Sequence, residues 1–415
     1  MSDQIRTVSA RWIFPVEGAP IERGMIVIAN GLIESIGRRD GRSVDRDFPD
    51  ASLVPGFVNA HTHLELTPIA CDETDEIRWL QSVIEHRRRS TPESSAAAIA
   101  ANLAQAIRLG TTLIGDVTTD FASANITACA PVRSFVYSEL LGLKHERGVE
   151  TTRRAWEIAE RLEAERGDDS GSSGVRGDRR LGFSPHAPYS TAGWIYRKAA
   201  ASGRPLTTHL AETPEEIELL RDRSGRMRDF LESIGAWDEN WAPIGSKPSD
   251  YLKSEGLDRV DWIVAHGTYL QKTDFSLFSI PTDRDDPRRS IAYCPRTHAR
   301  FGHAPHPYRR ILELGGAVCI GTDGLSSAAT LGVLDELRFV RRIDRSLECE
   351  TLLRMGTLNG AWAFRLDRET GSLTPGKSAD IAAVAIPDRN PSDPHELLFD
   401  SDRPVVATMF RGRFV

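Results

Sequence analysis

The spacing of hydrophobic positions along the chain changes near residue 54. Before that point, three short apolar runs are typical of strands: 7–14, 24–28 and 32–37. The Asn30-Gly31 pair between the last two runs is a strong signal for a tight hairpin. After that point, buried strand-like runs alternate with helical stretches such as 96–109. The pattern therefore predicts a small N-terminal β unit followed by an α/β structure.

Units of a strand followed by a helix recur from residue 54 to about residue 369. The strand-like runs of this part are 111–117, 132–137, 181–183, 206–208, 262–265, 291–293 and 317–320. Repeated units of this kind favour a parallel sheet with crossover helices, most economically a (β/α)8 TIM-like barrel. A doubly wound open sheet is the alternative, but no Gly-x-Gly-x-x-Gly sequence follows an early strand.

Two segments depart from this alternation. Residues 225–258 contain Trp, Gly and Pro and interrupt it, which predicts an insertion that could cover the site as a lid. After residue 369 the pattern returns to short strands, which can pair with the N-terminal ones. We therefore expect a small β-sandwich domain built from both termini (1–53 and 370–415) and a barrel over 54–369.

Composition and charge exclude several classes of function. Apolar residues make up 40% and charged residues 27% of the 415 positions, as in soluble globular proteins. The net charge of −7 argues against a nucleic acid polymer or an anionic membrane as partner, so we expect a small-molecule substrate. No apolar run approaches the roughly 20 residues that span a bilayer. Five scattered cysteines predict reduced thiols in a cytoplasmic protein.

Histidines and a carboxylate follow several predicted strands directly. His61 and His63 end the first barrel strand, where alternate side chains share a face. His209, His266 and Asp323 come directly after three later strands. His61, His63, His209 and Asp323 together would supply three imidazoles and one carboxylate to one divalent metal ion, zinc foremost and iron as the alternative. A structural role is the alternative for any one of them, but strand-end clusters in a chain with 11 histidines favour a common site.

Two further residues would complete the chemistry of such a site. A bound metal lowers the pKa of its water toward 7 and so makes hydroxide available. Glu212 lies three residues after His209, where it can move a proton between that water and a substrate. His266 can orient or polarise the water.

These clusters also carry a family resemblance. The stretches Pro55-Gly56-Phe57-Val58-Asn59-Ala60-His61-Thr62-His63, His209-Leu210-Ala211-Glu212, His266-Gly267 and Gly321-Thr322-Asp323 resemble the amidohydrolase superfamily, in the branch of chlorohydrolases and nucleoside deaminases. The resemblance implies one metal ion bound by the four ligands named above, with Glu212, His266 and Asp323 as catalytic residues. It implies a hydrolytic deaminase of a purine nucleoside or related aminated heterocycle, and it is compatible with a homo-oligomer. The same machinery can hydrolyse an amide or displace chloride from a triazine-like ring, and this alternative stays open.

The resemblance also implies positions that contact the substrate. Trp79 and Glu85 follow the metal pair closely, in a region that contacts base and ribose in the nucleoside deaminases of this branch, and His186 matches a family substrate-contact position. Core packing is the alternative for Trp79, and a solvated charge is the alternative for Glu85. Glu65 is open between a substrate contact and a buried salt bridge.

A narrower resemblance points to aminofutalosine deaminases. It rests on residues 63–67, on the segment around Trp79 and on residues 294–303. Their substrate carries a carboxylated aromatic group, which Arg296 or Arg300 could bind as a bidentate partner. In this segment the chain has Thr297-His298 where many members of the branch have Ser-Asn.

Overall fold

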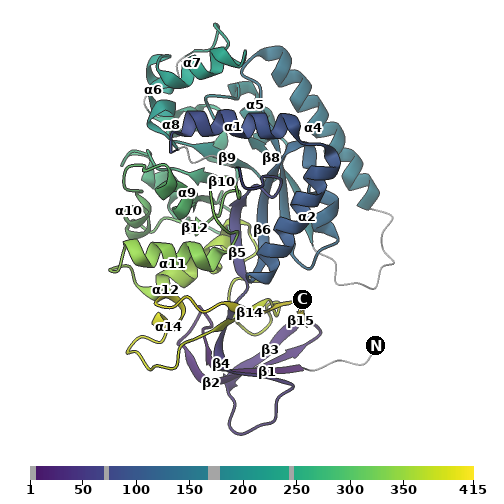
Figure 1. Cartoon of the computed structure of the whole chain (residues 1–415), viewed down its shortest axis with the longest axis vertical. Helices are drawn as coiled ribbons and strands as arrows, with labels where there is room; N and C mark the ends of the chain where they lie inside the picture. The colour runs from purple at the N-terminus through teal and green to yellow at the C-terminus, as the bar shows by residue number, and fades with distance from the viewer. Residues whose placement is uncertain (1–5, 70–73, 167–177, 243–246) are drawn as a thin grey trace.

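The computed structural model describes residues 6–69, 74–166, 178–242 and 247–415, and in it an eight-stranded barrel stands on a smaller β-sheet (Figure 1). The strands of these residues are β1 (Arg6–Ile13), β2 (Ile21–Ala29), β3 (Leu32–Arg38), β4 (Arg46–Pro55), β5 (Phe57–Thr62), β6 (Thr111–Thr118), β7 (Arg133–Leu140), β8 (Arg179–Pro185), β9 (Thr207–Leu210), β10 (Trp262–His266), β11 (Arg289–Tyr293), β12 (Val318–Ile320), β13 (Ile381–Ala385), β14 (Val405–Phe410) and β15 (Arg413–Phe414).

The α-helices of the described residues are α1 (Glu76–Arg89), α2 (Pro92–Arg108), α3 (Ala124–Ala128), α4 (His145–Arg166), α5 (Gly193–Ala200), α6 (Pro214–Asp222), α7 (Arg226–Ser233), α8 (Pro248–Ser254), α9 (Pro295–Arg300), α10 (Tyr308–Glu313), α11 (Val333–Ile343), α12 (Cys349–Met355), α13 (Leu358–Ala363) and α14 (Glu396–Phe399). Short 3-10 turns are η1 (Thr119–Phe121), η2 (Leu257–Arg259) and η3 (Phe275–Phe278). No described helix is long and apolar enough to cross a bilayer.

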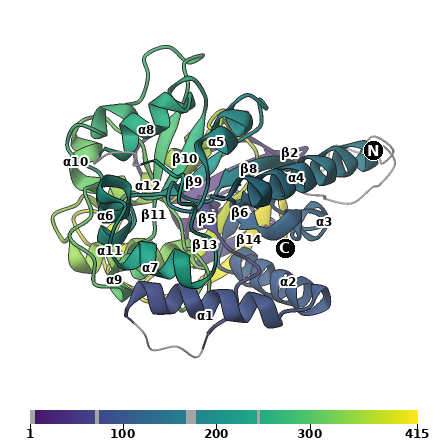
Figure 2. The same ribbon diagram turned by 90° about the horizontal axis from the view of Figure 1, so that it is seen from above.

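Strands β5 to β12 close into a parallel barrel in chain order. They form two four-stranded sheets, β5-β6-β7-β8 and β9-β10-β11-β12. Parallel bridges between Phe183 and Leu206 and between Thr62 and Asp323 join the two sheets at both seams. Figure 2 looks down on this barrel, with strand labels at the centre and helices around them. The predicted (β/α)8 barrel is thus confirmed.

The barrel strands are buried on both faces. Every residue of β5, β6 and β7 is buried, because one face packs inside the barrel and the other against the surrounding helices. Apolar side chains fill both sides, while the polar ends of the strands collect at one rim. That rim is where the four predicted metal ligands lie.

Strands from both termini form one seven-stranded sheet in the order β15-β14-β13-β4-β1-β2-β3, which confirms the predicted composite β domain. Its Asn30-Gly31 turn has positive φ at both residues, 53° and 80°, as a type I′ hairpin requires. The sheet curls back on itself, since the N–H of Ile33 donates to the carbonyl of Lys377 and the N–H of Gly376 to the carbonyl of Ile33. The domain limits at residues 53 and 370 stay a prediction.

The segment predicted as an insertion lies between β9 and β10. It contains α7 and α8, and its residues 243–246 lie outside the described residues. Helix α7 lies at the same end of the molecule as α1 and α6 (Figure 1). Its role as a lid stays a prediction.

Asp116 on β6 is a buried carboxylate beside the first barrel strand. One of its oxygens accepts a hydrogen bond from the N–H of Leu64 at 2.8 Å, and burial raises the pKa of this carboxyl to about 7. Its unfolded pKa is about 3.9, so the folded state disfavours the ionised form.

As pH rises, the free energy of unfolding of the parent is expected to fall relative to that of the Asp116→Asn variant. Because the folded pKa is raised, the stability that Asp116 contributes to the parent is fully present below about pH 4. It is lost as pH rises to about 7, and the loss amounts to roughly 4 kcal/mol at 1.36 kcal/mol per pKa unit. Urea unfolding of both proteins at pH 5 and pH 8 measures this. A difference that is independent of pH would contradict the assignment.

Candidate active site

Three histidines converge at the carboxyl rim of the barrel. His61 and His63 come from the end of β5 and His209 from β9, and one ring nitrogen of each lies within 4.8 Å of the others. Their exposed fractions are 1%, 5% and 6%. Both ring nitrogens of His61 and Nδ1 of His63 have no hydrogen-bond partner among the described residues. Buried nitrogens in this state are costly unless a ligand binds them, so the cluster fits a metal ion.

Asp323, which follows β12, adds a carboxylate to the cluster. Its Oδ1 lies 3.7 Å from Nε2 of His63 and 4.0 Å from Nε2 of His61. Its Oδ2 accepts a hydrogen bond from the hydroxyl of Ser327 at 2.6 Å and one from Thr297 at 3.3 Å. These two hydroxyls orient the carboxylate so that its other oxygen faces the histidines. Sequence reasoning gave no role to Ser327, because a serine four residues after Asp323 carries no distinctive pattern.

A backbone carbonyl orients the ring of His209. Nδ1 of His209 lies 3.1 Å from the carbonyl oxygen of His186, which can only accept, so Nδ1 carries the proton. The Nε2 lone pair is then directed at the cluster, 3.4 Å from Nε2 of His63. This is the outer-shell arrangement that metal-binding histidines generally have.

The chain turns sharply directly after three of the barrel strands. Ala211, His266 and Asp323 adopt left-handed backbone conformations with φ of 52°, 67° and 54°. Such conformations are uncommon for residues other than glycine and concentrate at functional sites. They bring the side chains at the strand ends over the rim of the barrel.

Glu212 and His266 form a close pair beside the cluster. Oε1 of Glu212 lies 3.1 Å from Nε2 of His266. Burial, together with the nearby Glu76, Asp323 and Glu216, raises the pKa of Glu212 well above its ordinary value. Burial lowers the pKa of His266 to about 4. The neutral form of each group is therefore favoured, and a protonated Glu212 carboxyl can donate to Nε2 of His266.

The carboxylate of Glu216 holds the loop that carries Glu212. It accepts hydrogen bonds from the N–H groups of Ala211 and Glu212 at 3.0 and 2.8 Å, and it is fully buried. Burial raises its pKa to about 7. Sequence reasoning missed Glu216, because in the sequence it looks like an ordinary acidic residue in the first turn of a helix.

A cavity of about 560 Å³ opens above these groups, within the size range of small-molecule sites. His63, His209, His266, Glu212 and Asp323 line its inner end. Apolar side chains from two helices line one part of its wall: Trp79, Leu80, Val83 and Ile84 from α1, Phe230 and Leu231 from α7, and Ile234 just after it. Charged side chains line another part: Arg87, Arg88, Glu139, Lys144 and Arg147.

Two of the predicted substrate contacts line this cavity. Trp79 is 7% exposed, donates its indole N–H to the carbonyl of Ser326 at 3.1 Å and packs on Phe301. Trp79 therefore packs against its neighbours and lines the cavity at the same time. His186 also lines the cavity, with Nδ1 2.6 Å from the hydroxyl of Ser190.

The other three predicted contacts are not brought to the cavity, which corrects the expectation for them. Glu85 lies on the outer face of α1, where its side chain is 62% exposed and pairs with Arg89. Arg296 is bound to the buried Glu336 at 2.6 Å and to the carbonyl of Thr330 at 2.7 Å. Arg300 is not among the residues that line the cavity. Short helices such as α9 present only some side chains to the rim, and neither arginine is among them.

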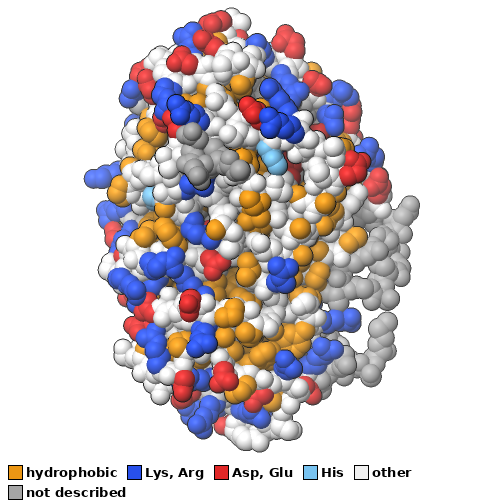
Figure 3. All heavy atoms as spheres, in the orientation of Figure 1, with side chains coloured by type: hydrophobic (Ala, Val, Ile, Leu, Met, Phe, Trp, Pro, Cys, Tyr) orange, Lys and Arg blue, Asp and Glu red, His pale blue; other side chains and the backbone are white. Residues whose placement is uncertain are grey.

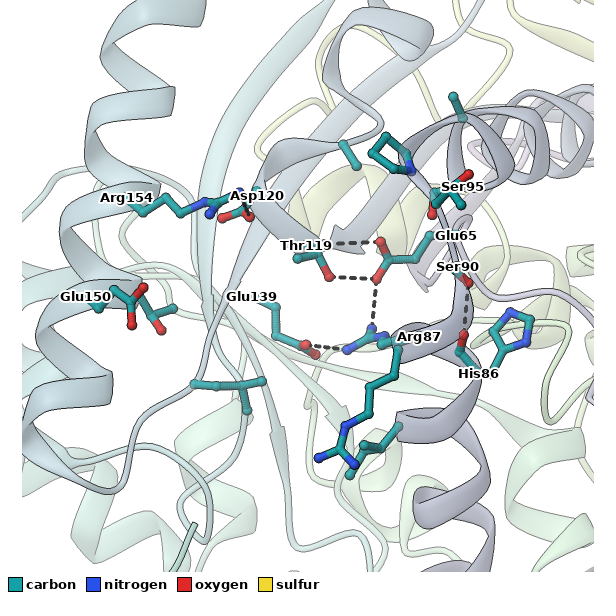
Figure 4. Close-up of a pocket in the computed structure, with 18 of the residues that line it drawn as sticks. Glu65, His86, Arg87, Ser90, Ser95, Thr119, Asp120, Glu139, Glu150 and Arg154 are labelled. Carbon is teal, nitrogen blue, oxygen red and sulfur yellow. Dashed lines mark hydrogen bonds and ion pairs between the residues drawn. The ribbon is translucent and has the colours of Figure 1, made fainter. Parts of the chain in front are cut away.

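Glu65 is part of a buried salt bridge rather than a free group in the cavity. Its carboxylate pairs with Arg87 at 2.9 Å and accepts hydrogen bonds from Thr118 and Thr119 (Figure 4). Sequence reasoning left Arg87 out, since it stands in a run of three arginines without a distinguishing pattern.

Comparisons with known proteins agree with this architecture. The model of the amidohydrolase family matches residues 52–415. A 5-methylthioadenosine/S-adenosylhomocysteine deaminase of Pyrococcus furiosus is 24% identical over 413 residues, covering 94% of this chain and 88% of that protein. The chain superposes with a TM-score of 0.79 on a zinc-bound adenosine deaminase of Xanthomonas campestris (21% identity; 98% and 92% covered). The TM-score is also 0.79 for the aminofutalosine deaminase of Helicobacter pylori (20% identity; 99% and 100% covered).

Proposed function

The chain belongs to the amidohydrolase family, and we propose that it is a metal-dependent hydrolytic deaminase of a purine nucleoside or related aminated heterocycle, with aminofutalosine among the candidates. The observation that carries this proposal is the convergence of His61, His63, His209 and Asp323 beside the close pair of Glu212 and His266. The names of its relatives support it, since several of them are nucleoside deaminases.

The four converging residues would hold one divalent metal ion. Three imidazoles and one carboxylate suit zinc best, with iron as the alternative, and they leave a position open for water. When bound, the ion supplies Lewis acidity that makes a water molecule nucleophilic near neutral pH. None of the barrel strands β5 to β12 contains a lysine that could serve as a bridging ligand, which favours a single ion.

Glu212 is the proposed proton donor. Hydrolytic deamination adds the oxygen of water to the ring carbon that carries the amino group, protonates the adjacent ring nitrogen and releases ammonia. The raised pKa of Glu212 favours its protonated form, which can donate to the ring nitrogen. Asp323 accepts a proton from the attacking water and passes it to the departing amino group, which leaves as ammonia, while Glu212 recovers its proton from the newly added hydroxyl. Neutral His266 orients the attacking water.

The shape of the cavity supports an aromatic heterocycle as substrate. Trp79 and Val83 offer an apolar wall against which a planar ring can pack. His186 offers a polar ring nitrogen at the same cavity. The four free cysteines of the described residues are consistent with the proposed cytoplasmic location, and a homo-oligomer stays a prediction.

The proposal predicts that metal-loaded protein releases ammonia from at least one adenine, guanine or cytosine derivative, aminofutalosine included. A coupled ammonia assay measures this, with protein stripped by a chelator as the control. Chelation is expected to abolish the release, and zinc or iron to restore it. Release of a carboxylate or a halide instead of ammonia would favour hydrolysis of an amide or a triazine halide.

A further inference from the structure

A second cavity of about 720 Å³ lies beside the substrate cavity. Figure 4 shows its lining, which carries several polar and charged side chains, among them Glu65, Thr119, Asp120, Glu150 and Arg154. The two cavities have several lining residues in common: Ile84, Arg87, Arg88, Glu139, Leu141 and Arg147. These shared residues form the partition between the cavities.

Arg87 is the central polar contact of this partition. Its guanidinium binds Glu65 at 2.9 Å and Glu139 at 2.7 Å (Figure 4). The two carboxylate side chains are only 8% and 4% exposed, whereas that of Arg87 is 28% exposed. Burial alone would raise the pKa of Glu139, but the charge of Arg87 outweighs it and holds this pKa at about 2. The positive charge of one arginine therefore compensates the negative charges of two buried carboxylates.

The two carboxylates belong to the barrel and the arginine to a helix above it. Glu65 lies two residues after His63, and Glu139 lies on β7 with Oε1 3.9 Å from Nε2 of His186. Arg87 is on α1, where Trp79, Val83 and Arg87 follow at intervals of four residues and so share one face of the helix. All three line the substrate cavity. The contacts of Arg87 therefore set how the cavity-facing side of α1 lies on the barrel.

We propose that Arg87 is a positioning and specificity-determining residue: it anchors α1 to the ends of β5 and β7 and separates the substrate cavity from the second cavity. The inference rests on the proposed deaminase function for its specificity part, while the anchoring of α1 is independent of it. The partition then limits the size of the group that a substrate can carry beyond its aminated ring.

The test compares Arg87→Ala with Arg87→Met. Alanine removes both the charge and the bulk, so the cavities join and the ratio of kcat/KM for a bulky over a small substrate rises about tenfold. Adenosine and 5′-deoxy-5′-(benzylthio)adenosine serve as the two substrates. Methionine keeps most of the bulk, so this ratio stays near that of the parent while KM rises for both substrates. In both variants amide hydrogen exchange in residues 76–89 becomes faster.

Arg154→Ala is the matched control. Arg154 lines only the second cavity and pairs with Asp120 at 2.8 Å, so its loss removes an arginine–carboxylate pair without touching the partition. Neither the substrate ratio nor the exchange of α1 is expected to change.

Unchanged exchange in α1 together with a substrate ratio within about twofold of the parent's would overturn the proposal. If Arg87→Ala does not fold, amide hydrogen exchange of α1 in Arg87→Met is the test. Exchange in α1 as slow as in the parent would then overturn the anchoring role. A parent protein that releases ammonia neither from these two nucleosides nor from any other compound of the ammonia assay refutes the proposed function instead, and the exchange measurement then tests Arg87 without any activity.

Discussion

Replacing His209 by alanine is expected to remove the bound metal and to lower kcat/KM by roughly a thousandfold or more, since several kcal/mol of transition-state stabilisation depend on the ion. His209 is the proposed imidazole ligand from the second four-stranded sheet of the barrel. It comes from β9, while His61 and His63 come from β5. Without it, two imidazoles and a carboxylate remain, one ligand fewer than the proposed set, so the ion is expected to bind too weakly to survive purification.

Metal content per chain, measured by elemental analysis after purification without chelator, checks this prediction beside the ammonia assay. The matched control is His395→Ala, because His395 is also buried but pairs with Asp393, away from the barrel rim. That variant should keep its metal and its activity. A His209→Ala protein with the metal content of the parent would contradict the assigned ligand set.

Replacing Glu212 by glutamine is expected to lower kcat by about 10²- to 10⁴-fold while the metal stays bound, as loss of a general acid does. Glutamine keeps the shape of the side chain and can still contact His266, but it has no acidic proton to give to a ring nitrogen. The fall should be in kcat more than in KM, because the lost interaction acts in the transition state.

Glu215→Gln is the control for this variant. Glu215 lies on the same loop and helix start and pairs with Arg226 at 3.3 Å, but it does not line the cavity. Its replacement should leave kcat unchanged. Equal kcat for Glu212→Gln and the parent would show that another group supplies the proton.

The principal elements of the site could be predicted from the residue pattern because a parallel barrel follows a simple rule. Its strands run in chain order and end at one rim, so polar residues directly after strands must meet there. His61, His209, His266 and Asp323 all follow this rule, and the structure brings them together. The Asn30-Gly31 hairpin was predictable for an equally local reason.

Residues that reach the rim from helices could not be assigned in this way. Arg87, Arg88 and Arg89 are indistinguishable in the sequence, and only the packing of α1 brings Arg87 onto Glu65 and Glu139. Packing also decides where the side chain of Arg296 lies: it pairs with the buried Glu336 and does not line the cavity.

The sequence by itself therefore determined the barrel, the composite β domain and the set of residues at the strand ends, because these depend on hydrophobic period and chain order. Only the tertiary structure decided which hydroxyls hold Asp323, how Glu216 supports Glu212, and which arginine separates the two cavities. Some of those contacts are close in sequence, such as Ser327 with Asp323, and others are distant, such as Arg87 with Glu139, 52 positions away. No residue pattern singles out any of them. Their distances follow from how helices pack on the barrel, and that packing is a property of the whole chain.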